Sequence, residues 1–451
     1  ASPPSTTVVA SVLVGCFLSL MVGFWLLSRS RALPIQRALV AALLLVSSMG
    51  YVGLARAQDG PLPKTAPGFL LHQYAADNLA HDIHGLALGP DDEVFVAGPG
   101  YLGQLIDTNL DGVADQFAPV SFQPRQGAQG LLVERDWLWV VADQAIWQVP
   151  RTPGENTRKW MELPKTGGEH DFHSLRRGND GWLYFLAGNH AQIDSRFITS
   201  PLPIARPLAG VVGRISPDGQ IRQVLVHGMR NAYGFDFDLD GSFLLYDSDD
   251  ERDAGLPWYR PTTLFSAVEG ADLGWVSRCF KKPTGTLGAA TIRAETGRGS
   301  PTGVAVQRGL AFGPDYFGSV AFADWTFGRV YLQRRANRDH TIPPEILVES
   351  QSGGAFAPTS MAFDSRGHLW IATGGRNTSG AVFVVQRDAA KSTDLETETI
   401  ASKTEAITDL ALWFASMGSP SKDSTFHEQQ LIPWSNVIEQ QDKLTEALQK
   451  W

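Results

Sequence analysis

Six segments of the chain repeat one pattern: a pair of apolar residues, a turn that contains Asp or Gly, and a strand with alternating apolar residues. A unit of this kind cannot bury its own faces, so several units pack radially around a central channel. The pattern predicts an all-β, six-bladed β-propeller over residues 58–386. A β-sandwich or a pair of smaller sheets is the alternative, which six similarly built segments disfavour. The six turns lie roughly 40 to 75 residues apart and centre near Pro90, Arg135, Asn179, Leu239, Pro314 and Arg366.

The charge and the cysteine content exclude several classes of protein. The formal net charge is −9, and no basic run is long enough to neutralise a phosphate backbone, so nucleic acid is not expected as a partner. Cys16 and Cys279 are the two cysteines, too few for a disulfide framework or a cysteine-rich metal site. No Cys-x-x-Cys-His motif is present, so no covalently attached haem is expected.

The first 57 residues contain two long apolar runs, at about 8–27 and 38–54. The first has the length of about 20 residues that crosses a hydrocarbon core as a helix. Arg29, Arg31 and Arg37 lie between the runs, and such positive charge stays on the cytoplasmic side. The pattern predicts a transmembrane helical hairpin in contact with membrane lipid. It would anchor the chain in a bacterial inner membrane, with the propeller on the periplasmic side.

A second interpretation concerns the later apolar run, at 38–54, which ends in Ala55-Arg56-Ala57. An end of this kind is typical of a cleavable signal peptide, whose removal would take away everything before Gln58. The length of the first run and the flanking charges favour the hairpin.

The chain changes in composition over residues 387–451. Charged residues are interleaved there with apolar ones such as Ile407, Leu410 and Trp413, and a second stretch continues the pattern to Leu448. This spacing predicts amphipathic helices. The helical extension is expected either to cap the propeller or to dock on a neighbouring subunit.

A loop in the first repeat has the composition of a calcium-binding loop. Carboxylate and amide side chains alternate at Asp107, Asn109, Asp111 and Asp115, and Gly112 permits a sharp turn. Calcium loops use such oxygen ligands, although the distal bidentate Glu is missing here. The segment is predicted either to bind calcium or to form a polar turn between two strands.

Three segments carry a resemblance to a known family: EHDFHSLRRG at 169–178, HGMRNAYGFDFDLDG from His227, and YDSDDERDAGLPWYRPT from Tyr246. About three-quarters of the chain resembles the soluble quinoprotein glucose/sorbosone dehydrogenases, and more closely the membrane-bound dehydrogenase domains found in large secreted bacterial proteins. The resemblance implies a propeller that oxidises a sugar with pyrroloquinoline quinone (PQQ) and calcium.

The resemblance also implies roles for individual residues. His170 matches the general base that takes the proton of the sugar hydroxyl, a task that suits an imidazole. Arg230 and Asn231 match the pair beside the quinone, where a guanidinium stabilises negative charge. Gln129 matches a glutamine on the substrate side.

The cofactor site shows both a match and two gaps. The acidic stretch with Asp247 and Asp249 takes the place of the family's calcium loop. The family's last blade supplies arginines to the quinone carboxylates, yet residues 356–361 contain none. In the preceding blade only Arg329 is available as the usual basic residue. A tricarboxylate without cations binds weakly, so the sequence predicts calcium more readily than PQQ.

Two functions therefore stay open. One is a PQQ- and calcium-dependent sugar or alcohol dehydrogenase. The other, which the gaps favour, is a catalytically degenerate accessory or scaffold subunit of a respiratory or photosynthetic electron-transfer complex in the membrane. In that case His170 and His173 would hydrogen-bond between blades, and Arg230 would pair with Asp236 or Asp247 as a brace.

Overall fold

The computed structural model describes the central part of the chain. The predicted hairpin of residues 1–57, Cys279 and all but the first two residues of the predicted extension at 387–451 lie outside the described residues. Within the described part, no helix combines the length and the apolarity needed to cross a membrane. The described residues are 61–121, 129–151, 156–166, 168–277, 280–282, 288, 290–337 and 339–388.

The described residues form six antiparallel sheets of four main strands each. In the first three, the strands from the centre outward are β3 (Gly85–Leu88), β4 (Val94–Gly98), β5 (Tyr101–Ile106) and β6 (Gln116–Ser121); β7 (Gly130–Val133), β8 (Trp137–Ala142), β9 (Ala145–Pro150) and β10 (Arg158–Glu162); β11 (Phe172–Arg177), β12 (Leu183–Ala187), β13 (Gly210–Ile215) and β14 (Arg222–Met229).

The next three sheets follow the same order from the centre outward. They are β15 (Phe235–Phe237), β16 (Phe243–Asp247), β17 (Thr262–Ala267) and β21 (Ala290–Gly297); β22 (Pro301–Val306), β23 (Val320–Asp324), β24 (Arg329–Gln333) and β25 (Glu345–Glu349); β26 (Pro358–Phe363), β27 (Leu369–Thr373), β28 (Ala381–Arg387) and β2 (Phe69–Ala75).

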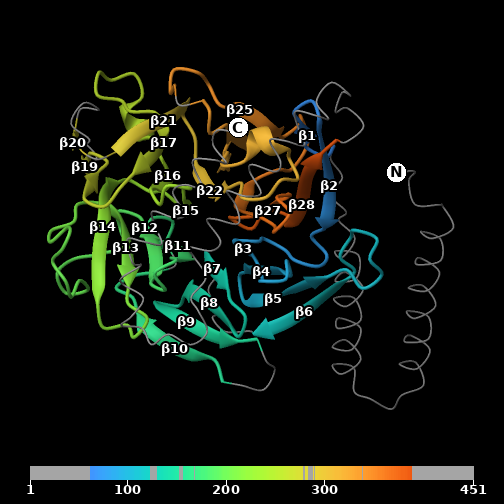
Figure 1. The fold of residues 1–451 in the computed structure, drawn as a ribbon, viewed down its shortest axis with the longest axis horizontal. Helices are drawn as coiled ribbons and strands as arrows, with labels where there is room; N and C mark the ends of the chain where they lie inside the picture. Colours follow the sequence, from blue (N-terminus) through green and yellow to red (C-terminus); the bar gives the residue numbers. More distant parts are fainter. Residues whose placement is uncertain are drawn as a thin grey trace, which may run out of the picture. The chain divides into compact units, whose positions relative to one another are not determined.

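The ring of blades is closed by the N-terminal strands. In Figure 1 the colours run round the ring, and the blue strand β2 lies beside the orange-red strand β28. The two pair antiparallel, with Phe69 opposite Arg387. β1 (Lys64–Thr65) pairs in the same way with β25 of the preceding blade. This closure leaves no open edge between the first and last blades.

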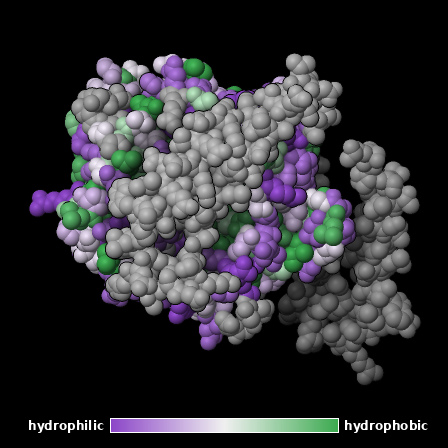
Figure 2. Space-filling model, viewed as in Figure 1, coloured by the Kyte–Doolittle hydropathy of each residue, from purple (hydrophilic) through white to green (hydrophobic). Residues whose placement is uncertain are grey.

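A few short strands and 3-10 helices lie outside the four main strands of the blades. β18 (Ala271–Asp272) adds in parallel to β14, and β19 (Trp275–Ser277) pairs with β20 (Phe280–Lys281). Two 3-10 helices, η1 (Glu251–Asp253) and η3 (Pro314–Tyr316), lie in the connections after β16 and β22. On the face drawn in Figure 2, the described surface mixes hydrophilic and hydrophobic side chains at short intervals.

The hydrophobic core consists of six clusters, one between each pair of neighbouring blades. Between the fourth and fifth blades, for example, the buried ring of Phe322 packs against Tyr246 at 4.8 Å and Tyr331 at 5.3 Å between centroids. Alternating aromatic and β-branched residues on each blade therefore fill the gap to the next one, as radial packing requires.

The structure confirms the six-bladed propeller, and the two-sheet alternatives are wrong. Each of the six predicted turn centres falls in the connection between the first and second strands of one blade. The described strands extend from Lys64 to Arg387, one residue beyond the end of the predicted repeat at 386.

Replacing Phe322 tests the packing between blades. Its side chain is fully buried, so Phe322→Ala is expected to lower the free energy of unfolding by about 3–5 kcal/mol through lost contacts and a cavity. Phe327→Ala, at a side chain that is 49% exposed, should stay within about 0.5 kcal/mol. Equal effects in denaturant unfolding would contradict this account of the core.

Candidate functional site

A cavity of about 350 Å³ lies at the mouth of the central channel. Its lining comes from residues just before the first strand of a blade or just after the second strand, and antiparallel pairing brings these positions to the same end of the propeller. All six blades contribute. The chemistry-bearing residues of the lining are His84, Gln129, Glu169, His170, Arg230, Asn231, Tyr233, Ser248, Glu251, Trp325, Thr359 and Arg376.

The carboxylate of Asp247 orders one wall of this mouth cavity. Asp247 ends strand β16, and its two oxygens accept hydrogen bonds from the backbone N–H groups of Arg230 at 2.8 Å and Asn231 at 2.7 Å. Burial raises the pKa of Asp247, while these hydrogen bonds oppose the shift. The acid that was predicted to bind calcium therefore holds the connection between the third and fourth blades.

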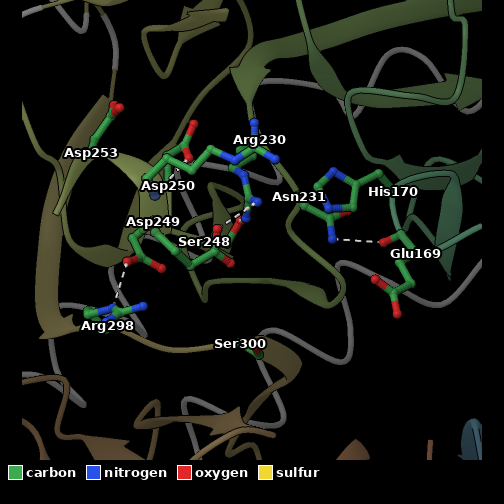
Figure 3. A network of polar contacts seen from close by, with 12 residues as sticks. Glu169, His170, Arg230, Asn231, Ser248, Asp249, Asp250, Asp253, Arg298 and Ser300 are labelled. Atoms are coloured by element: carbon green, nitrogen blue, oxygen red, sulfur yellow. Dashed lines mark hydrogen bonds and ion pairs between the residues drawn. The ribbon is translucent and has the colours of Figure 1, made fainter. Parts of the chain in front are cut away.

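The side chain of Arg230 lies along the cavity wall. Its guanidinium donates to Ser248 Oγ at 3.0 Å, as Figure 3 shows, and to Glu251 Oε2 at 3.1 Å. The alternative in which Arg230 braces Asp236 is wrong, because Asp236 pairs with Arg308 at 3.0 Å. Arg230 thus presents its charge to the cavity with an acidic partner at the rim.

His170 lies beside Arg230 with one ring nitrogen bound and one available. Its Nδ1 is 2.6 Å from Asn189 Oδ1, which places the proton on Nδ1. Its ring stacks on that of His190 at 4.7 Å. Among the described residues, no hydrogen-bond partner is found for its Nε2. Burial, reinforced by the charge of Arg230, lowers the pKa of His170, so the ring is neutral at pH 7 and its Nε2 lone pair can accept a proton.

His173 plays a different part. It is fully buried, and its two ring nitrogens lie 2.9 Å from the side-chain amides of Gln129 and Asn231. Its ring stacks on Tyr233 at 3.7 Å. Asn231 also donates to the carbonyl oxygen of Glu169 at 2.8 Å. His173 therefore joins the second, third and fourth blades, as one of the sequence-based alternatives proposed for it.

The structure brings Gln129, His170, Arg230 and Asn231 to one cavity. Sequence reasoning missed other residues of its lining, above all Arg376 in the connection between β27 and β28. Arg376 pairs with Glu169 at 2.7 Å and lies 5.2 Å from the ring of Trp325. Residues 356–361 contain no arginine, as the sequence shows, but the last blade supplies Arg376 to the cavity from a different connection. The Gly374-Gly375 pair before Arg376, at the end of a second strand, was the available signal.

Arg329, the basic residue considered for the preceding blade, lies elsewhere. It pairs with Glu349 on the neighbouring outer strand at 2.7 Å. In that blade Trp325 faces the cavity instead, and its Nε1 donates to the carbonyl oxygen of Gly374 at 2.7 Å. This bond fixes the loop that carries Arg376.

The first predicted calcium loop lies in the connection between β5 and β6, away from the cavity lining. The Asp107 carboxylate accepts from the backbone N–H groups of Asp111 at 3.2 Å and Gly112 at 2.8 Å. Asn109 and Asp111 hydrogen-bond to each other, and Asp115 accepts from Thr108 Oγ1 at 2.7 Å. The loop is held as an exposed polar turn by its own side chains.

In the second predicted calcium site, the acidic side chains also contact other groups of the protein. Asp249 accepts from the hydroxyl of Tyr259 at 2.9 Å and lies 4.0 Å from Arg298 (Figure 3). In the described part of the chain, no three His, Cys, Asp or Glu side chains are grouped so that they could hold a metal ion. Neither acidic loop is arranged as a calcium site in this geometry, and calcium binding stays a prediction.

Comparisons with solved structures find proteins of the same fold, whereas comparisons of the sequence find no match. No family model matches the chain, and no similar sequence is found among curated proteins. Several solved propellers are similar in structure. A PQQ-bound aldose sugar dehydrogenase from Streptomyces coelicolor is 16% identical, with a TM-score of 0.51 over 72% of this chain and 100% of that one. The chain has the β-propeller fold of quinoprotein sugar dehydrogenases.

Two fungal proteins give the same result. A Trichoderma reesei carbohydrate-active enzyme of family AA12, in its calcium structure, is 12% identical, with a TM-score of 0.54 over 74% of this chain and 98% of that one. The PQQ domain of a pyranose dehydrogenase from Coprinopsis cinerea is 14% identical, with a TM-score of 0.52 over 73% and 98%. At these identities the likeness establishes the fold.

The acid stability of the propeller tests the environment of His173. Burial lowers the pKa of His173 from 6.5 to about 3. An unfolded chain then binds more protons between these values, so His173 contributes stability above pH 6.5 that is lost as the pH falls toward 3. We expect wild type to lose up to about 1.4 kcal/mol per pH unit more than His173→Gln over this window.

The control for this measurement is His340→Gln, at an exposed position, which should keep the wild-type slope. Denaturant unfolding at several pH values reads out the difference. A slope that is the same in wild type and His173→Gln would show that His173 can be protonated in the folded state.

Proposed function

We propose that the chain is a dehydrogenase that oxidises a hydroxyl group of a sugar or a related alcohol at the mouth of its central channel. The observation that carries the proposal is His170: a ring kept neutral by burial, oriented by Asn189, with Nε2 available in a cavity that also holds Arg230. The fold of the solved sugar dehydrogenases supports the same function.

The residues of the mouth cavity fit PQQ, the cofactor named for two of the similar structures. The guanidiniums of Arg230 and Arg376 line the cavity and would bind the carboxylates of the cofactor. The rings of Tyr233 and Trp325 also line it and would pack against the planar rings of the cofactor. When bound, PQQ supplies the two-electron acceptor for the hydride that leaves the carbinol carbon.

The two guanidiniums can exchange partners with little loss. Arg230 pairs with Glu251 and Arg376 with Glu169, and these two glutamates are 50% and 61% exposed at their side chains. Ion pairs with such exposed partners contribute about 0–1 kcal/mol, because water competes for them. A carboxylate-bearing ligand can therefore replace the glutamates at the arginines.

His170 is the base that accepts the proton of the substrate hydroxyl group. Its Nε2 takes the hydroxyl proton as the carbinol carbon is oxidised to a carbonyl, and Asn189 keeps the ring oriented through Nδ1. The resulting imidazolium lies near the charge of Arg230, which disfavours it. The proton is then released to solvent, which resets the base. Arg230 binds oxygen atoms on which negative charge develops.

Attachment to the membrane extends this proposal. The apolar runs at 8–27 and 38–54 would hold the propeller at the periplasmic face of a bacterial inner membrane, where a membrane acceptor could reoxidise the cofactor. The accessory-subunit function is the second candidate. Its supporting observation is that both cavity arginines already pair with acids of the same chain.

Reconstitution with cofactor tests the two candidates against each other. The full chain is incubated with PQQ and calcium chloride, and aldose-dependent reduction of a dye acceptor is measured. Wild type should turn over, and His170→Asn should lower kcat about 10²–10⁴-fold while the PQQ absorption titration is unchanged. His340→Asn is the matched control. A wild-type chain that neither binds PQQ nor turns over, but co-purifies with membrane subunits, would overturn the dehydrogenase in favour of the accessory function.

The pH dependence of turnover gives a separate prediction. Because burial lowers the pKa of His170 below the ordinary 6.5, the basic form persists at mildly acidic pH. The kcat/KM of the reconstituted protein should fall on the acid side with a midpoint below pH 6.5, as protonation removes the base. An acid limb centred above pH 6.5 would contradict the assignment of His170.

A further inference from the structure

A second, smaller cavity of about 30 Å³ lies in the central channel next to the mouth cavity. The two cavities share His84, Gln129, Tyr233, Thr302 and Thr359 in their linings. The rest of the lining comes mainly from the innermost strands of the blades. A water molecule needs roughly 10–15 Å³ by this measure, so the cavity has room for one small ion or for one carboxylate group of a larger molecule.

Arg176, on the innermost strand β11, lines this channel cavity. Its guanidinium donates to the carbonyl oxygen of Leu175 at 3.0 Å, and within the described residues no carboxylate lies within ion-pair distance of it. The nearest charges are Asp236 and Arg308, and these two pair with each other at 3.0 Å. The three groups sum to one uncompensated positive charge.

Arg176 is half-buried, and a cation that is partly removed from water without an anionic partner is costly. Burial lowers the pKa of Arg176, but a guanidinium stays protonated at any pH a protein tolerates, so the charge cannot be removed by titration. The proposed reaction at the mouth makes no use of it. The compensation has to come from something that enters the channel.

A second polar group in the same lining also lacks a partner. His84 Nε2 is buried and has no hydrogen-bond partner; Asp82 Oδ1 is 3.4 Å away but not aligned for a hydrogen bond. The hydroxyls of Thr359 and Ser360 donate to the backbone oxygens of Ile83 at 2.8 Å and Leu86 at 3.2 Å. His84 thus lines the cavity, but its Nε2 is covered by protein atoms, which leaves Arg176 as the charged donor among the described residues of the lining.

We propose that the channel cavity is a binding site for one small anion, a halide or a carboxylate group, held by Arg176. The guanidinium supplies the charge and the hydrogen bonds, and the volume limits the ligand to a few atoms. The anion comes either from solution or from a ligand in the adjoining mouth cavity that extends a carboxylate into the channel.

Thermal unfolding of the full chain in different sodium salts tests the site. At constant ionic strength, chloride, bromide and formate should raise the Tm saturably by about 2 °C or more relative to methanesulfonate, which is too large for the cavity and carries no carboxylate. Arg176→Met should abolish this dependence whatever its own Tm. Arg177→Met is the matched control, because the Arg177 side chain pairs with Glu134 at 2.6 Å and should leave the dependence intact.

The proposal is overturned if wild type shows no difference between chloride and methanesulfonate, or if Arg176→Met keeps the wild-type difference. Should Arg176→Met fail to fold, crystals of wild type grown with bromide decide instead. An anomalous peak within hydrogen-bond distance of the Arg176 guanidinium supports the site, and its absence overturns it.

A competition between PQQ and chloride shows where the anion comes from. If PQQ removes the chloride dependence of the Tm, a carboxylate from the mouth cavity occupies the channel site; if chloride dependence persists with PQQ bound, the site holds a free ion. Both results require the site. The salt measurement needs no PQQ, so its failure is distinct from a failure of the proposed dehydrogenase.

Discussion

The buried carboxylate of Asp247 is the interaction on which the site depends. Burying an acid is costly unless its oxygens are satisfied, and here two backbone N–H groups satisfy it. In return the acid fixes the peptide that carries Arg230 and Asn231 across the junction of the third and fourth blades. Arg230 then reaches the mouth cavity, and Asn231 turns toward His173. Together with the hydrogen bonds of Asn231 to His173 and to the carbonyl oxygen of Glu169, this link fixes the path of the connection over the end of the channel.

The channel separates two electrostatic environments. At the mouth, each cavity arginine faces an exposed acid, and the base His170 is neutral, so charge develops only when a ligand arrives or a proton moves. Deeper in the channel, Arg176 lies near Asp236, which already pairs with Arg308, so these three groups carry one net positive charge. A propeller permits this arrangement because its blades pack through six apolar clusters and leave the channel free for polar residues.

Much of the fold was predictable from the sequence, because propeller turns and alternating strands are local signals. The family resemblance singled out His170 and Arg230, and the structure places both in the lining of the mouth cavity. Arg376 was missed because its place at the mouth depends on closure of the ring, which sets the last blade opposite Glu169. Asp247 was interpreted as a metal ligand because a sequence does not show which backbone N–H groups will lie near a carboxylate. The apolar runs at 8–27 and 38–54 lie outside the described residues, and their membrane role stays a prediction.

The state of the His170 ring is the most direct test of the account. The measurement is an NMR titration of the imidazole nitrogens in the full chain, with the signals assigned by their loss in His170→Asn. The account predicts a neutral ring at pH 7 with the proton on Nδ1 and a titration midpoint below 6.5. A proton on Nε2, or a midpoint above 6.5, would contradict the claim that His170 is a base available to the cavity.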